Sequence, residues 1–81
     1  MRVRLKLFAS LRESVGAGTL DLDLPEGATA EDAWARLVAA HPSLASRRGS
    51  LAAAVNRRYT PFDAPLSAGD EVVFIPPVSG G

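Results

Sequence analysis

The sequence closes with Phe74-Ile75-Pro76-Pro77-Val78-Ser79-Gly80-Gly81, and the reactive group that this segment offers is its terminal carboxylate. Two prolines lack an N–H and restrict φ, which predicts that a strand stops at Pro76 and that the chain leaves it extended. The run from Pro77 to Gly81 reaches at most roughly 16–18 Å. Its two glycines have no Cβ, so a narrow channel can close around their backbone. The spacing therefore indicates a tail that enters another protein's active site while the folded domain stays outside.

A free carboxylate is a poor electrophile, because its charge must be overcome before a nucleophile adds to the carbonyl. ATP can convert it into an acyl-adenylate, from which a sulfur nucleophile displaces AMP and leaves a thiocarboxylate. An amine attacking the same carbonyl would instead give a ubiquitin-style conjugate. The chain has no Gly-rich phosphate loop ending in Lys, so we expect a separate enzyme to activate the tail. A frayed, idle tail on a non-covalent binding module is the remaining alternative.

The composition argues against several other classes of function. The chain has 81 residues, 47% of them hydrophobic, which suits one small packed domain. Nine basic residues balance nine acidic ones, which argues against a nucleic-acid partner. Without cysteine and with a single histidine, no disulfide, thiolate or clustered metal site is expected. The sequence shows no signal peptide or membrane-spanning run, so we expect a cytoplasmic protein without a membrane partner.

Two segments near the start alternate apolar and polar residues, which is typical of half-buried strands. The first is residues 2–8, in which three apolar side chains face one way: Val3, Leu5 and Leu7. The second is residues 19–24, where Asp21 and Asp23 could lie opposite the basic residues of the first segment in an antiparallel pair. Phe8 breaks the pattern, because its parity places an aromatic ring on the otherwise charged face.

Capping signals predict the helices. Ser10 and Glu13 have the spacing of a capping box for a short helical turn. Thr29 is a good N-cap for a main helix that His41 closes. An apolar stripe on that helix should face the core: Ala30, Ala33, Trp34 and Leu37. We interpret His41 as a helix-end residue rather than a catalytic base. We expect residues 43–50 to form a loop or irregular turn, which Leu44 could anchor.

The remaining strands complete the predicted fold. Residues 51–56 predict a third strand, residues 57–62 a short strand or arm, and the apolar run 71–75 a strand covered on both faces. A right-handed crossover through the main helix would bring the last strand parallel to the first and beside it. The fold class is α+β: a β-grasp (ubiquitin-like) roll over residues 1–76, with a mixed sheet of four to five strands and one main helix on one face. Residues 77–81 form the extended tail.

Alternation in the last strand places Val73 and Ile75 on the face away from the main helix. Phe8 lies on this face by its parity, and Tyr59 could extend the same patch. An apolar cluster near the exit of the tail favours a docking surface for a partner over scattered surface residues.

The chain resembles the MoaD-type small subunits of molybdopterin synthase, which are sulfur carriers of the ThiS-like superfamily. The resemblance covers essentially the whole chain and rests on four segments: 8–13, 54–56, 65–72 and 74–81. It implies that Gly81 is adenylated by a MoeB-type E1-like enzyme, which uses ATP, and becomes a thiocarboxylate with sulfur from a donor protein. The carrier itself would be no enzyme and would bind no cofactor.

The same resemblance implies a second partner, the MoaE-type large subunit, in a heterotetramer of two small and two large subunits. The inserted tail would comprise Pro77, Val78, Ser79, Gly80 and Gly81, and the sulfur would pass to cyclic pyranopterin monophosphate. The partner interface would include the positions of Phe8, Tyr59 and Ile75, two of which (Tyr59 and Ile75) replace other apolar residues often found there. Since Gly-Gly ends are shared by related carriers, thiamin or tRNA thiolation and protein modification remain alternatives.

Overall fold

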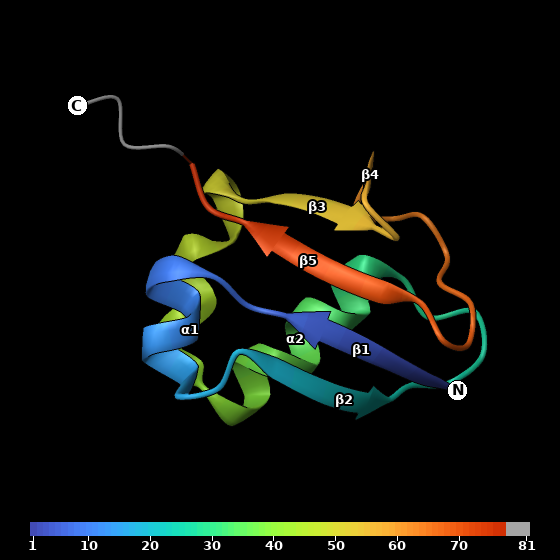
Figure 1. Cartoon of the computed structure of the whole chain (residues 1–81), viewed down its shortest axis with the longest axis horizontal. Helices are drawn as coiled ribbons and strands as arrows, with labels where there is room; N and C mark the ends of the chain where they lie inside the picture. Colours follow the sequence, from blue (N-terminus) through green and yellow to red (C-terminus); the bar gives the residue numbers. More distant parts are fainter. Residues whose placement is uncertain (78–81) are drawn as a thin grey trace.

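The computed structural model describes residues 1–77, which form a mixed five-stranded sheet with helices (Figure 1). The elements in chain order are β1 (Arg2–Lys6), α1 (Ala9–Val15), β2 (Thr19–Asp23), α2 (Ala30–Ala40), the 3₁₀ segment η1 (Pro42–Ser50), β3 (Ala52–Val55), β4 (Arg58–Thr60) and β5 (Glu71–Ile75). The strand order is β2-β1-β5-β3-β4. As predicted, the last strand is central and runs parallel to the first, while all other pairs are antiparallel.

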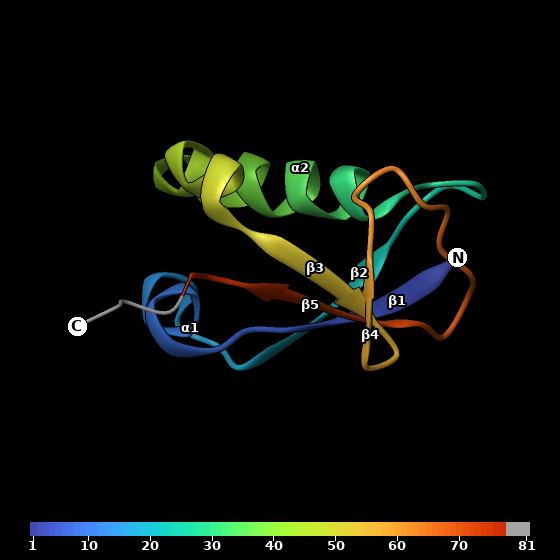
Figure 2. The same cartoon turned by 90° about the horizontal axis from the view of Figure 1, so that it is seen from above.

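The core lies between the sheet and α2, which runs along one face of the sheet (Figure 2). Phe74 of β5 is fully buried, and its ring packs edge-on against Trp34 of α2, with 5.1 Å between centroids. The ring of Phe62 stacks on that of Phe74, with 5.9 Å between centroids. Trp34 is therefore a core residue, as its place on the helix stripe predicted.

The main helix begins as expected, and the segment after it is more regular than predicted. Thr29 and Asp32 form a complete capping box in which each side chain accepts from the other residue's backbone N–H. Residues 43–50, predicted as a loop or irregular turn, belong to the 3₁₀ segment η1, which starts at Pro42 directly after the C-cap residue His41. Leu44 is buried in the core, and this one apolar anchor holds the 3₁₀ turns against the domain.

The predicted capping box at Ser10 is wrong. Helix α1 starts at Ala9 with Phe8 as its N-cap, and no side chain caps it. The helix starts two residues earlier than the pattern indicated, so Ser10 already lies inside the first turn. Its hydroxyl accepts a hydrogen bond of 2.7 Å from Arg47 of η1 instead, and so joins two segments that are distant in sequence.

Charged residues support the sheet at its β1–β2 edge. Arg2 pairs with Asp23 at 3.1 Å and Arg4 with Asp21 at 3.2 Å, as the alternation predicted. Lys6 turns toward Glu71 of β5, at 3.9 Å, because its partner in β2 is the uncharged Thr19. These pairs are exposed, so they specify register more than they add stability.

The turn between β3 and β4 consists of Asn56 and Arg57, both with positive φ (51° and 70°), as a type I′ hairpin turn requires. Asn56 binds the start of β5 through its side chain: its amide donates to Asp70 at 2.9 Å and its carbonyl accepts from the N–H of Glu71 at 3.0 Å. The hairpin is thereby attached to the central strand.

Candidate docking surface

The sheet face opposite α2 carries a row of side chains that crosses four strands. Lys6 of β1 lies beside Val73 of β5, Val73 beside Ala54 of β3, and Ala54 beside Tyr59 of β4. Val72 and Phe74 point to the core from the same strand that presents Val73 outward, since side chains alternate along a strand. The row is therefore a direct consequence of register.

This face is hollowed at the row, with a volume of about 340 Å³. We call the residues that line the hollow the docking surface: Lys6, Phe8, Ala54, Arg57, Tyr59, Glu71, Val73 and Ile75. All four residues predicted as a partner interface, Phe8, Tyr59, Val73 and Ile75, are among them. Their part in binding a partner stays a prediction.

The two aromatic residues of the docking surface are the large hydrophobic side chains that residues 1–77 leave exposed. Phe8 is 50% exposed and Tyr59 77% exposed. Phe8 follows β1 and caps α1, so the bend between those elements holds its ring near the end of β5. An aromatic pair on a rigid sheet is a common anchor for protein association, because it buries much area at a low entropic cost.

Four residues of the docking surface were not predicted from the sequence: Lys6, Ala54, Arg57 and Glu71. Lys6 shares its parity with Phe8, so this signal was present in the alternation of β1. Ala54 becomes recognisable only when the β3–β5 register is known, because a run of alanines gives no period. Glu71 and Lys6 form a half-buried ion pair, and Arg57 adds a further positive charge.

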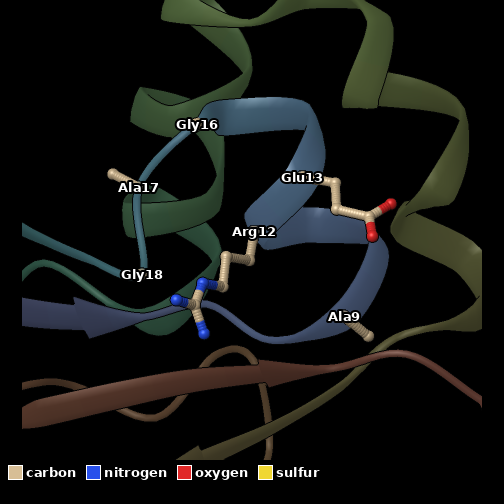
Figure 3. A pocket seen from close by; sticks show the side chains of 6 residues that line it. All are labelled: Ala9, Arg12, Glu13, Gly16, Ala17 and Gly18. Atoms are coloured by element: carbon tan, nitrogen blue, oxygen red, sulfur yellow. The ribbon is translucent and has the colours of Figure 1, made fainter.

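A larger hollow, of about 520 Å³, lies at α1 and the turn after it (Figure 3). Its charged lining residues are Arg12 and Glu13, and their side chains point in different directions rather than toward one point. Such an arrangement does not resemble a catalytic pair. Within residues 1–77, no group of three or more metal-ligating side chains occurs, and no helix has the length and apolarity needed to cross a bilayer.

The strand that contributes Val73 and Ile75 leads directly into Pro76, where the sheet ends as predicted. Pro77 is the last residue that the structure describes and is exposed. The predicted tail positions Val78, Ser79, Gly80 and Gly81 lie outside the described residues. The docking surface and the start of the tail are thus parts of one strand and its continuation.

Comparisons with known proteins agree with this architecture. Residues 5–81 match the ThiS family. The molybdopterin synthase sulfur carrier subunit of Chlamydomonas reinhardtii is 41% identical over 83 residues, covering 100% of both chains. Small archaeal modifier protein 1 of Haloferax volcanii is 43% identical over 84 residues, covering 94% of this chain and 97% of the relative.

Solved structures give the same result. The crystal structure of SAMP1 from Haloferax volcanii superposes with a TM-score of 0.88 at 37% identity and covers 100% of both chains. A complex of subunits 1 and 2 of the molybdopterin-converting factor from Helicobacter pylori matches with a TM-score of 0.68. At 22% identity over 100% of both chains, that likeness shows the fold alone.

A mixed sheet with one main helix on one face and a central last strand defines a β-grasp, ubiquitin-like protein. The chain belongs to the ThiS family. Its predicted resemblance to molybdopterin synthase sulfur carrier subunits is confirmed by relatives that align along its whole length.

Proposed function

We propose that this protein is the sulfur-carrier subunit of a molybdopterin synthase. In this proposal the carboxylate of Gly81 is activated and converted to a thiocarboxylate, whose sulfur is given to cyclic pyranopterin monophosphate during molybdenum cofactor biosynthesis. The observation that carries the proposal is the continuity of β5: Val73 and Ile75 line the docking surface, and the next residues begin the tail. Full-length similarity to named sulfur carrier subunits supports it.

The proposed chemistry has two steps before delivery. A MoeB-type enzyme joins the Gly81 carboxylate to the α-phosphate of ATP, which gives an acyl-adenylate and releases pyrophosphate. A sulfur nucleophile from a donor protein then attacks the carbonyl carbon and AMP leaves. The C–O bond to AMP breaks as the C–S bond forms, and with a persulfide as the nucleophile this gives an acyl disulfide. A thiol completes the step by attacking the donor's sulfur in that S–S bond: the donor leaves in a disulfide with the thiol, and the thiocarboxylate stays on Gly81. ATP is used by the activating enzyme, so the carrier needs no cofactor of its own.

The carrier itself contributes by positioning its C-terminal tail. The docking surface would bind a MoaE-type large subunit, while the residues from Pro77 onward reach into that subunit's active site. A fully extended chain from Pro77 to Gly81 spans at most roughly 16–18 Å, so the domain must dock close to the reacting pterin. A rigid, apolar surface beside the exit of the tail meets this need.

Reconstitution tests the proposal. The protein is incubated with a MoeB-type enzyme, ATP and a sulfur donor, and its intact mass should rise by one oxygen-to-sulfur exchange. The thiocarboxylated product, mixed with a purified MoaE-type subunit and the pterin precursor, should then yield the dithiolene. An unchanged mass would mean an idle tail, and a thiocarboxylate that gives no dithiolene would exclude this assignment.

Two variants separate tail chemistry from docking. Deletion of Gly81 should abolish sulfur transfer and leave binding of the large subunit intact. Phe8→Asp should weaken that binding about tenfold or more, because a charge would be buried in an apolar contact. Ser46→Asp, an exposed change on η1, serves as the matched control and should bind normally.

A second candidate function is protein modification, which the identity to small archaeal modifier protein 1 favours. The same activated Gly81 carbonyl would then be attacked by a lysine amine and form an isopeptide bond. Incubation with the activating enzyme, ATP and cell extract distinguishes the two: covalent adducts that survive thiol reductant would indicate a modifier.

A further inference from the structure

Strand β2 is an edge of the sheet, and one set of its backbone groups points away from β1. Leu7 donates to Gly18 at 2.9 Å, and Met1 and Leu24 exchange hydrogen bonds of 2.6 and 2.8 Å, so the hydrogen-bonded pairs with β1 fall on alternate residues. The intervening residues of β2 direct their N–H and C=O groups outward: Thr19, Asp21 and Asp23. Within residues 1–77, no other strand pairs with this edge.

The helix side of this edge is hollow and largely apolar. Leu20 and Leu22 of β2 are half-buried and point toward α2, where their side chains pack on the core. They line a hollow of about 410 Å³ together with Asp21 and Asp23 at its strand edge and with four residues of α2 and its C-cap: Arg36, Leu37, Ala40 and His41. An added strand would therefore find apolar contacts on this side for every second side chain.

The opposite side of the same edge carries two carboxylates. Asp21 and Asp23 remain 46% and 73% exposed although each pairs with an arginine of β1. A second copy that paired here through its own β2 would place aspartates against aspartates, and like charges across strands are destabilising. The edge is therefore unfavourable for self-association and favourable for a strand with basic residues on this side.

Strand β1 shows which kind of strand pairs well with β2. β1 reads Arg2-Val3-Arg4-Leu5-Lys6, with its apolar residues in the core and two of its basic residues on the β2 aspartates. The outer edge of β2 presents the same alternation to solvent. We infer that this edge binds, by strand addition, an extended segment of a partner protein in which basic and apolar residues alternate.

The inferred site is separate from the docking surface. The docking surface crosses β1, β5, β3 and β4 on the face opposite α2, whereas β2 lies at the far edge from β4 (Figure 1). Both could be occupied together, so the inference does not depend on sulfur transfer.

A peptide of the β1 sequence, residues 2–7 with blocked ends, is a direct probe. Titrated into ¹⁵N-labelled protein, it should shift the amide signals of β2 and of the α2 residues that line the hollow. Amide exchange should slow at Thr19, Asp21 and Asp23, whose N–H groups acquire partners. A control peptide with glutamate at the three basic positions should not bind.

Matched variants test separately how much the aspartates and the apolar hollow contribute to peptide binding. Asp21→Asn and Asp23→Asn should each weaken binding of the peptide about two- to fivefold, while Asp63→Asn, at an exposed loop, should not. Ala40→Gln should fill the hollow and weaken binding, whereas the neighbouring exposed Ala39→Gln should leave it unchanged. These substitutions lie outside the core, so circular dichroism should show an unaltered fold.

Three results would overturn the inference. The first is no binding of the β1 peptide at millimolar concentration, and the second is equal binding of the acidic control. The third is a set of signal changes on the docking surface instead of β2. Protection of β2 amides that rises with protein concentration alone would show that a second copy occupies the edge.

Discussion

Asn56 and Arg57 share a turn with positive φ, but replacing them should have opposite effects on stability. Arg57→Gly removes the steric cost of a left-handed backbone and should raise the free energy of unfolding by about 1 kcal/mol. Asn56→Gly loses the hydrogen bonds to the start of β5 and should lower it by about 1 kcal/mol. Urea unfolding of both variants checks this prediction. A destabilised Arg57→Gly would show that the turn is unstrained.

Phe74 should be among the most sensitive positions in the chain. It is fully buried and its ring packs against those of Trp34 and Phe62, so Phe74→Ala should cost about 3–5 kcal/mol. A domain of this size has a total stability of roughly 4–12 kcal/mol, so a large unfolded fraction is expected. Tyr59→Ala, at a residue that is 77% exposed, is the control and should change stability by less than about 0.5 kcal/mol. Equal losses in the two variants would contradict the assigned core.

At the scale of elements, two acidic residues should make stability depend on pH. The hydrogen bond from Arg2 holds the pKa of Asp23 below its ordinary value of 3.8, and Arg48 likewise lowers the pKa of Glu31 below 4.5. A lowered folded-state pKa contributes stability above the unfolded-state value, and that contribution is lost as the pH falls through the folded-state value. The urea midpoint should therefore decrease below about pH 5.

The effect should be small, because both pairs are exposed to solvent and screened by salt. Asp23→Asn and Glu31→Gln should flatten this decrease, and added salt should do the same. Asp63→Asn, for which no ion pair is found in the described residues, provides the control. A pH profile identical in all variants would mean that other carboxylates set it.

Element type was largely predictable because strong local signals coincide with the tertiary environment. The apolar run of β5 is the central strand, although only its face toward α2 is fully buried, and Thr29 caps the main helix. The sequence showed less where distant contacts decide. Residues 42–50 form regular 3₁₀ turns around the predicted anchor Leu44, and Ser10 binds Arg47 instead of capping α1. For the docking surface, the alternation of side chains along β5 predicted that Val73 and Ile75 face away from α2. That Ala54 lies beside them could be recognised only from the register between β3 and β5.

At the scale of the whole molecule, the fold should be independent of its last residues. The buried core extends from Val3 to Phe74, so deletion of residues 78–81 should leave the free energy of unfolding unchanged. Under the proposed function the same deletion should remove sulfur transfer completely. Thermal unfolding and the intact-mass assay measure the two properties on one sample. A truncated chain that unfolds at a lower temperature would show that the tail supports the domain.

The central position of β5 also has a mechanical consequence. Its hydrogen bonds run to β1 on one side and to β3 on the other, and all of them lie across the direction in which the strand leaves the sheet. A force applied to the chain beyond Pro76 would act in shear on the hydrogen bonds of β5 to both neighbouring strands. Many of these hydrogen bonds would therefore have to break together rather than one after another. We therefore expect the domain to stay folded when a partner protein exerts force on the C-terminal end of the chain.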